Sequence, residues 1–392
     1  MRNVFLVKYG EIGIKGKNRF IFENHLVDTI KNNLKDIGSF HVFKDQGRIM
    51  IHPDCDILHK ELIIQKLTKI FGIVAVAEGT MEEEVSMEAI KKLSLEHMKT
   101  LCKDKTVSFK VQARRSDKKF PLNSMEISAQ IGEYILDELG DKVFVDVHNP
   151  EILLSIELRK GTYVYSTIYK GTGGMPYGTN GKATLLLSGG IDSPVAGWMI
   201  AKRGVIIDAV YFHSPPYTSE RAKEKVIDLA KKIALYTGSF NVYIVPFTDI
   251  QMQIYQKCPH EQITLIMRRI MMRIADKIAK ANGSMALITG ESIGQVASQT
   301  MQSLVVTDNV TNMPVFRPLI GFDKEEIVQL AKKIDTFETS ILPYEDCCTI
   351  FVPKHPETKP RIDSIMRSER VLEDTLEDMI EEAISNAEIT KV

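Results

Sequence analysis

A strand pattern that turns directly into a helix pattern through a glycine loop is the feature that most constrains the fold. Residues 183 to 187 form a five-residue run that predicts a buried strand, the loop Ser188-Gly-Gly-Ile-Asp-Ser193 follows, and a helix-like stretch continues to Gly204. Such a turn directs the unpaired N–H groups of the first helical turn, and the positive end of the helix dipole, above the sheet edge. Phosphate is the natural ligand there, so we expect ATP chemistry at this loop.

The side chains of the loop predict one kind of phosphate chemistry. Gly189 and Gly190 allow close backbone approach, and Ser188 and Ser193 add hydroxyl donors. Asp192 places a carboxylate in an anion site, which is unfavourable unless a divalent cation lies between them, and it therefore predicts Mg²⁺. The lysine of GxxxxGK[ST] loops, which act on the γ-phosphate, is absent. An ordinary glycine turn is the alternative interpretation.

Length and composition indicate a multidomain protein without a membrane span. The 392 residues exceed the roughly 150 typical of one domain, and no stretch of about 18 uncharged apolar residues occurs. We expect a cytoplasmic protein. Five cysteines without CxxC spacing argue against a disulfide framework and a structural metal. The net charge of −1 hides a mildly basic body, because residues 368–392 carry 8 acidic and only 2 basic side chains.

The order of the periodic segments predicts three domains and a linker. Residues 1–59 and 60–170 each indicate an α+β domain, and residues 171–181 hold five glycines and a proline, as a linker would. Residues 182–392 alternate strands and helices, which predicts a doubly wound parallel α/β sheet. Its expected strands lie near 183–187, 205–212, 240–246 and 285–288, and its expected helices near 193–203, 219–237, 261–281 and 323–335, with an acidic helix over 362–387.

The ends of the expected parallel strands predict where the nucleotide lies. Ligands of such sheets bind beyond the carboxyl ends of the strands. Leu186 and Leu187 end the first strand and Tyr211 and Phe212 the second, where they would hold an adenine. Gly290 opens a polar loop after the fourth strand, and a plain turn remains the alternative for it.

Three arginines lie on one expected helix with apolar neighbours. Because Arg268, Arg269 and Arg273 share that helix, one of them must face a polar cleft, and a triphosphate suits it because Arg grips two oxygens at once. A solvated face with ion pairs is the alternative for Arg269 and Arg273.

Several segments together resemble the tRNA 4-thiouridine synthetase family, also called tRNA uracil 4-sulfurtransferases. The SGGIDS loop is similar to the PP-loop of enzymes that cut ATP between its α- and β-phosphates. The segments that carry the resemblance are KYGEIGIKGKNR at 8–19, SGGIDSPVAGW at 188–198, FHSPPYTSERAKEKV at 212–226, TGESIGQVASQT at 289–300, RPLIGFDKEEI at 317–327 and YEDCC at 344–348.

The resemblance implies a fold and a set of site residues. It implies a ferredoxin-like domain over 1–59, an RNA-binding THUMP domain over 60–170 and a PP-loop domain over 182–392. It also implies catalytic roles for Asp192, Lys324 and Cys347. The implied ATP site consists of the loop from Ser188 to Ser193 with Leu186, Leu187, Tyr211, Phe212, Arg268, Gly290 and Gln299.

The implied reaction has an activation step and a sulfur step. O4 of the uridine at position 8 of tRNA attacks the α-phosphorus of ATP and expels pyrophosphate, and a persulfide sulfur then displaces AMP from C4. Longer family members carry the persulfide on an added rhodanese domain, whereas this chain stops at residue 392. We therefore expect Cys347 to receive sulfur from a cysteine desulfurase and Cys348 to resolve the intermediate. Sulfur transfer to the carrier protein of thiamine synthesis is an implied second role.

RNA contact is expected from basic clusters in the N-terminal half. The densest clusters hold Lys8, Lys15, Lys17 and Arg19, and then Lys110, Arg114, Arg115, Lys118 and Lys119. Phosphate contacts of this kind bind without reading sequence, so shape would select the uridine. A solubilising face is the alternative for each cluster. A homodimer would help if the RNA-binding part of one subunit served the ATP site of the other.

Two other functions compete with this interpretation. A PP-loop synthetase that amidates a small metabolite would explain the ATP site but leaves the first 170 residues without a role. An RNA-binding protein that only senses ATP would need neither Asp192 nor Cys347.

Overall fold

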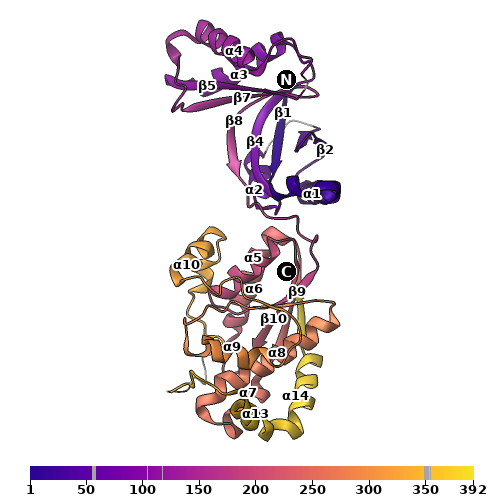
Figure 1. Cartoon of the computed structure of the whole chain (residues 1–392), viewed down its shortest axis with the longest axis vertical. Coiled ribbons are helices and arrows are strands. Elements are labelled where there is room, and N and C mark those ends of the chain that lie inside the picture. Colours follow the sequence, from indigo (N-terminus) through magenta and orange to yellow (C-terminus); the bar gives the residue numbers. More distant parts are fainter. Residues whose placement is uncertain (55–58, 104, 117, 348–352, 354) are drawn as a thin grey trace. The chain divides into compact units, whose positions relative to one another are not determined.

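The computed structural model describes the whole chain except residues 55–58, 104, 117, 348–352 and 354 (Figure 1). It divides into two compact units, Met1–Pro176 and Tyr177–Val392, and the division falls within the glycine-rich stretch 171–181. Cys348, the predicted resolving cysteine, lies outside the described residues.

One eight-stranded sheet runs through the first unit in the order β2-β3-β1-β4-β8-β7-β5-β6. Strand β4 pairs antiparallel with β1 on one side and with β8 on the other, so the sheet crosses the domain boundary expected at residue 60. The strands are β1 (Arg2–Tyr9), β2 (Phe40–Asp45), β3 (Arg48–Pro53), β4 (Ile73–Glu82), β5 (Val107–Arg115), β6 (Val143–Val145), β7 (Ile152–Leu158) and β8 (Thr162–Lys170).

The helices of this unit cover the sheet in two pairs with separate apolar cores. Helices α1 (Arg19–Leu34) and α2 (Lys60–Lys69) bury residues such as Leu26 and Leu67 against β1, β3 and β4. Helices α3 (Met87–Leu101) and α4 (Ser124–Leu139) pack over β5 and β7 (Figure 1). Short 3₁₀ turns occur at Glu11–Ile14, Gly16–Asn18 and Gly140–Lys142.

A buried ion network joins the two halves of this sheet. The Glu157 carboxylate on β7 is 2% exposed and accepts hydrogen bonds from the Arg48 guanidinium (3.2 Å) on β3, from Arg159 (2.6 Å) and from the Tyr165 hydroxyl (2.8 Å). Arg159 also donates to the backbone oxygen of Asp45 at 3.0 Å. Burial alone would raise the pKa of Glu157, but the two guanidinium groups outweigh it and lower the pKa.

The second unit is built on a six-stranded sheet in the order β13-β12-β9-β10-β11-β14. The predicted doubly wound α/β fold is confirmed, because β9 pairs in parallel with β10 on one side and with β12 on the other. The strand order therefore reverses beside β9, the usual ligand position in such sheets. The strands are β9 (Lys182–Leu186), β10 (Ile206–His213), β11 (Asn241–Pro246), β12 (Leu287–Ile288), β13 (Val315–Phe316) and β14 (Glu388–Lys391).

Helices pack on both faces of this sheet. Helix α5 packs with α6 and α10, and α8 packs with α7 and α9. The helices are α5 (Asp192–Ala201), α6 (Glu220–Thr237), α7 (Thr248–Lys257), α8 (Ile263–Ala281), α9 (Met301–Asp308), α10 (Lys324–Lys333), α11 (Phe337–Ser340), α13 (Ile362–Glu369) and α14 (Glu373–Ser385), with 3₁₀ turns at His260–Gln262, Ala297–Gln299 and Arg370–Leu372. Within the described ranges, no helix has the length and apolar character needed to cross a membrane.

The expectation of one acidic helix over residues 362–387 was wrong. The segment forms α13, a 3₁₀ turn and α14, and the chain then ends in β14, which pairs antiparallel with β11. Leu372 in the turn and Leu376 in α14 both bury in the main apolar core of the unit. Strand β14 is four residues long and pairs with β11, which is far away in the sequence, so the local pattern did not predict it.

We expect loss of the Glu157 carboxylate to destabilise the first unit. Glu157→Ala removes the carboxylate that pairs with the partly buried Arg48 and leaves Arg159 with Asp45 at 3.8 Å, which should cost about 3–5 kcal/mol of unfolding free energy, measured by urea denaturation. The stabilisation should also fade as the pH drops through the lowered pKa of Glu157, because protonation removes the charge.

The matched control for this prediction is Glu151→Ala. Glu151 pairs with Lys105 at 3.5 Å, and the two side chains are 53% and 64% exposed. Its loss should cost less than about 1 kcal/mol. Equal effects of the two substitutions would show that the network does not stabilise the sheet.

Candidate functional site

A cavity of about 450 Å³ opens where the strand order reverses, beyond the carboxyl ends of β9, β10 and β12. The structure brings most of the predicted nucleotide-site residues into its wall: Leu186, Leu187, Ser188, Gly190, Asp192, Ser193, Tyr211, Phe212, Arg268, Gly290, Gln299 and Cys347. Of the remaining predictions, Gly189 lies within the loop itself and Lys324 contacts Asp192.

The loop between β9 and α5 is held by its own serines and by Gly290. The Ser188 N–H donates to the Ser193 hydroxyl at 2.9 Å, and the Gly190 N–H donates to the Ser188 hydroxyl at 3.3 Å. A Cβ atom on Gly290 would lie 2.6 Å from the Ser193 nitrogen. Glycine at 290 therefore allows the loop after β12 to pack directly on the first turn of α5.

Asp192 is the charged centre of the loop. One carboxylate oxygen accepts a hydrogen bond from the Lys324 ammonium at 2.7 Å, and the other accepts one from the Gln295 amide at 2.7 Å. Lys324 begins α10, where a capping box of Asp323 and Glu326 fixes the first turn. Lys324 is an exposed helix lysine, as its position alone would suggest, and its ammonium also contacts the loop through Asp192. Gln295 was not predicted.

The strand-end residues give the cavity an apolar part. Tyr211 and Phe212 lie near the carboxyl end of β10, and the Phe212 ring packs edge-on against Phe247 with centroids 5.2 Å apart. Methionines Met271 and Met272 of α8 complete this wall. A flat, apolar base fits such a lining.

Of the three arginines on α8, Arg268 is the one that lines the cavity. It pairs with Glu291 and donates to the Ser298 hydroxyl at 3.3 Å. Arg269 is buried, and both Arg269 and Arg273 pair with Glu369. The ion-pair alternative thus holds for these two, although Arg269 is not solvated.

Glu291 is a second carboxylate that the sequence did not reveal. It is buried, and besides Arg268 it accepts from the Arg317 guanidinium at 2.6 Å and from the Thr289 hydroxyl at 2.8 Å. Gln299 closes the same loop, since its side-chain oxygen accepts from the Ser292 N–H at 3.3 Å. The TGES segment is therefore part of the cavity wall, held in place by hydrogen bonds and ion pairs, and not a plain turn.

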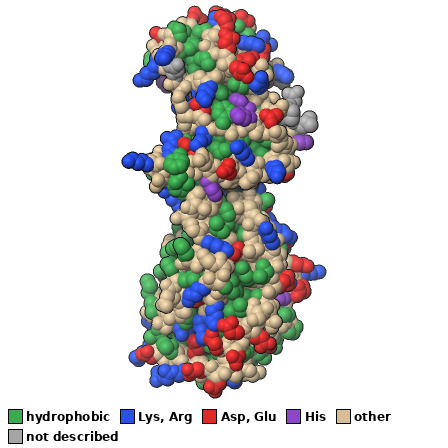
Figure 2. All heavy atoms as spheres, turned by 90° about the vertical axis from the view of Figure 1, so that its right-hand side faces the viewer, with side chains coloured by type: hydrophobic (Ala, Val, Ile, Leu, Met, Phe, Trp, Pro, Cys, Tyr) green, Lys and Arg blue, Asp and Glu red, His purple; other side chains and the backbone are tan. Residues whose placement is uncertain are grey.

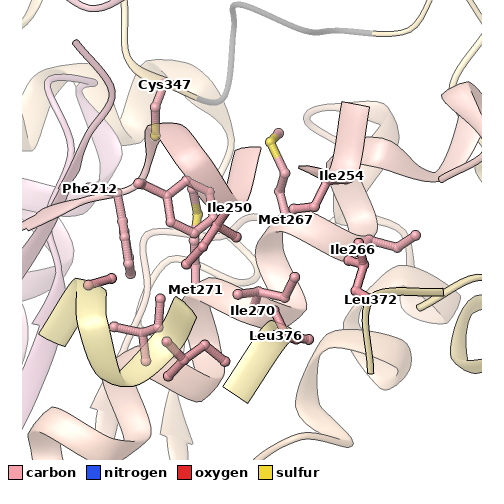
Figure 3. Close-up of a cluster of buried hydrophobic side chains, with 14 of the residues drawn as sticks. Phe212, Ile250, Ile254, Ile266, Met267, Ile270, Met271, Cys347, Leu372 and Leu376 are labelled. Carbon is pink, nitrogen blue, oxygen red and sulfur yellow. The ribbon is translucent and has the colours of Figure 1, made fainter. Parts of the chain in front are cut away.

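Cys347 lies where the cavity meets the apolar core. It is 4% exposed, and Figure 3 shows its side chain directed toward Phe212, Ile250 and Met271. Its backbone oxygen accepts from the Gln251 amide at 2.7 Å. The preceding residue, Asp346, also lines the cavity, and both of its carboxylate oxygens lie 3.0 Å from the Gly189 nitrogen. Asp346 and Gln251 were not predicted.

The described residues contain no group of three or more His, Cys, Asp or Glu side chains placed to hold a metal ion. A metal at this site would therefore need ligands beyond the protein, such as phosphate oxygens and water. Mg²⁺ commonly binds through one carboxylate together with substrate phosphates, and the Asp192 carboxylate at the cavity wall fits that mode.

The residues predicted to contact RNA lie in the first unit, and their roles differ. Lys15 and Lys17 are exposed beside α1, and Lys118 and Arg114 are exposed near the end of β5. In Figure 2, basic side chains project from this unit.

Two other predicted RNA contacts also hold the local backbone. Arg115 donates to the backbone oxygens of Lys118 (3.1 Å) and Phe120 (2.8 Å), so its guanidinium fixes a turn. Lys110 donates to the Val147 oxygen at 3.0 Å. The exposed side chains are therefore better placed for phosphate than Arg115.

Known proteins similar to this chain share its full length. A probable tRNA sulfurtransferase of Agathobacter rectalis is 54% identical over 393 residues, which cover 100% of this chain and 99% of the relative. A probable tRNA sulfurtransferase of Acetivibrio thermocellus is also 54% identical, with the same coverage. The crystal structure of a 4-thiouridine synthetase–RNA complex with bound ATP is 41% identical, with a TM-score of 0.89 and 100% of both chains covered.

Three family models also match the chain. Thiamine biosynthesis protein (ThiI) matches residues 178–373, the ThiI ferredoxin-like domain residues 4–77 and the THUMP domain residues 84–167. The resemblance deduced from the motifs is thereby confirmed. The chain belongs to the ThiI family of tRNA sulfurtransferases.

Proposed function

We propose that this protein uses ATP to activate O4 of uridine 8 in tRNA and replaces that oxygen with sulfur to give 4-thiouridine. The observation that carries the proposal is that one cavity is lined by the phosphate loop and by Cys347, and that Lys324 contacts the Asp192 carboxylate of this loop. Activation and sulfur delivery would thus occur at one site. The family membership and the similar ATP-bound 4-thiouridine synthetase support this assignment.

The cavity divides into parts that suit the parts of ATP. The adenine would lie between the strand-end residues Leu186, Tyr211 and Phe212, and the pyrophosphate at the N–H groups of the loop from Ser188 to Ser193. Arg268, steadied by Glu291, would bind phosphate oxygens.

We assign Asp192 as the protein ligand of Mg²⁺. When bound, the ion would neutralise phosphate charge and polarise the phosphoryl oxygens. The Lys324 ammonium, 2.7 Å from the same carboxylate, adds positive charge where pyrophosphate leaves.

The chemistry then needs two displacements. Uridine O4 attacks the α-phosphorus and pyrophosphate departs, which turns the carbonyl oxygen into part of an AMP leaving group. The terminal sulfur of a persulfide on Cys347 attacks C4, and AMP leaves with the bonding electrons. A second thiol must then attack the Cys347 sulfur to release the thiocarbonyl, and a disulfide remains. Cys348 follows Cys347 directly in the sequence and is our candidate for that thiol.

The proposed partners follow from these steps. The exposed basic residues of the first unit, with Lys15, Lys17 and Lys118 among them, would bind tRNA phosphates. A cysteine desulfurase would load Cys347 in the cytoplasm. Sulfur transfer to a carrier protein for thiamine is a second role, supported by the name of the matched family model. A homodimer would let one subunit present RNA to the other.

The deciding experiment supplies ATP, Mg²⁺, a cysteine desulfurase, cysteine and bulk tRNA, and measures 4-thiouridine by its near-ultraviolet absorbance. AMP formation from a small substrate with ammonia, without thiolated tRNA, would instead favour the amidating synthetase. ATP-dependent RNA binding without AMP would favour a sensor.

Two substitutions should separate the activation step from the sulfur step. Lys324→Met should slow tRNA-dependent pyrophosphate release about 100- to 1000-fold, because it removes a charge that stabilises the leaving group. Cys347→Ser should keep pyrophosphate release and abolish thiolation, because only the sulfur carrier is lost. Lys333→Met, an exposed lysine of the same helix, is the control. Thiolation by Cys347→Ser would show that another residue carries the sulfur.

Gly290→Ala should weaken ATP binding, measured by isothermal titration calorimetry. The added Cβ would lie 2.6 Å from the Ser193 nitrogen and 2.7 Å from the Asp192 carbonyl carbon, so the loop must move. The expected cost is about 1–3 kcal/mol, or at least about fivefold in the dissociation constant. Gly321→Ala is the control, since a Cβ added there would meet no heavy atom of the described residues within 4 Å. Unchanged ATP binding by Gly290→Ala would show that the close packing of Gly290 on the loop does not contribute to ATP binding.

A further inference from the structure

The Asp346 carboxylate lies where the proposed function places a phosphate. Both of its oxygens are 3.0 Å from the Gly189 nitrogen, and Gly189 belongs to the loop assigned to pyrophosphate. A negatively charged side chain thus uses a backbone donor that an anionic ligand would use. The rest of the segment around Asp346 shows what this contact holds in place.

A buried lysine secures the segment that carries Asp346. The Lys225 ammonium donates to the backbone oxygens of Leu342 (2.9 Å) and Tyr344 (3.3 Å), and the residue is 6% exposed. A Cβ atom on Gly189 would lie 3.2 Å from Asp346 and 3.3 Å from Lys225, so both side chains pack directly on the loop.

The Asp346 charge is held at a cost. Burial raises the pKa of Asp346, while the Gly189 N–H and the charge of Lys225 act in the opposite direction. The charge of Asp346 is therefore only partly compensated, and an anion that binds the Gly189 N–H more strongly can replace it.

The same segment sets the position of Cys347. Its backbone oxygen is bound by Gln251, whose side chain is buried in α7, and its thiol lies against the apolar core (Figure 3). Asp346 anchors one side of the cysteine to the nucleotide loop, and Gln251 anchors the other side to α7. Movement of Asp346 must therefore strain or shift the buried position of Cys347.

We propose that Asp346 is a positioning residue that couples the nucleotide loop to Cys347: the phosphates of ATP displace its carboxylate from Gly189 and thereby release Cys347 from its buried position. The inference rests on the proposed function, which places ATP at this loop. Two anions compete for one N–H group and repel each other, so both cannot remain there. The thiol would then become accessible for sulfur chemistry only when the activating nucleotide is bound.

The coupling predicts that loss of the Asp346 carboxylate raises the affinity for ATP instead of lowering it. Because Asp346 competes with phosphate, the empty site is only partly available, and removal of the competitor should tighten binding. We expect Asp346→Ala and Asp346→Asn each to lower the ATP dissociation constant about 3- to 10-fold in calorimetry. A residue that merely supports the cavity would weaken ATP binding when replaced. Glu345→Ala, the exposed neighbouring carboxylate, should leave the constant unchanged.

The second readout is the alkylation rate of Cys347. Iodoacetamide labelling followed by peptide mass spectrometry in a Cys348→Ser background reports Cys347 separately from its sequence neighbour. ATP should raise the rate at least about tenfold, pyrophosphate should raise it too, and adenosine, which has no phosphate, should not. Cys258, whose pKa burial raises to about 11, is an internal reference that should stay slow.

Each outcome supports or overturns the proposal. Tighter ATP binding by Asp346→Asn, which keeps the acceptor without the charge, together with ATP-dependent labelling of Cys347, supports it. Weaker binding by both variants, or labelling of Cys347 that ignores bound ATP, overturns it while leaving the proposed function intact. Failure of the unsubstituted chain to bind ATP would instead remove the proposed function and this inference together.

Discussion

The second unit depends on one electrostatic constraint: the N–H groups of a strand-to-helix loop require an anion. β9 ends at the position where the strand order reverses, so the loop lies beyond the hydrogen-bonded part of the sheet. The Asp346 carboxylate meets this requirement at the Gly189 N–H, and a second carboxylate, Asp192, lies within the loop. Asp192 lies within the loop and is held by Lys324 and Gln295, whereas Asp346 comes from a distant segment to Gly189. Both arrangements leave polar groups at the cavity wall to which a polyphosphate can bind.

Charge pairing has a different purpose in the first unit. There, Glu157 and the arginines around it are sealed into a continuous sheet, and their contacts link β7 to β3. The network joins two sequence segments that separate family models recognise. The exposed lysines that we propose to bind RNA, such as Lys15 and Lys118, lie on this unit.

Sequence reasoning named those cavity residues whose signal resides in a local pattern. The loop, the ends of the strands and Gly290 are each visible within a few residues, and the motif resemblance added Lys324 and Cys347. Sequence reasoning missed four residues because each acquires its role from a partner far away in the chain, as Asp346 does from Gly189. These residues are Glu291, Gln295, Asp346 and Gln251. Contacts of that range depend on how helices and strands pack, which residue spacing does not report. The same reason explains why β14 was not predicted.

That last strand has a consequence for the behaviour of the protein in solution. Four residues, Glu388–Lys391, pair with β11 and cover the side of the sheet that would otherwise present a row of unsatisfied backbone groups. Bare edges of this kind recruit strands from other molecules. Strand β14 therefore protects this edge of β11 from pairing with another molecule. Its polar, charged composition suits that task, because Lys391 and Glu388 discourage a second molecule from extending the sheet.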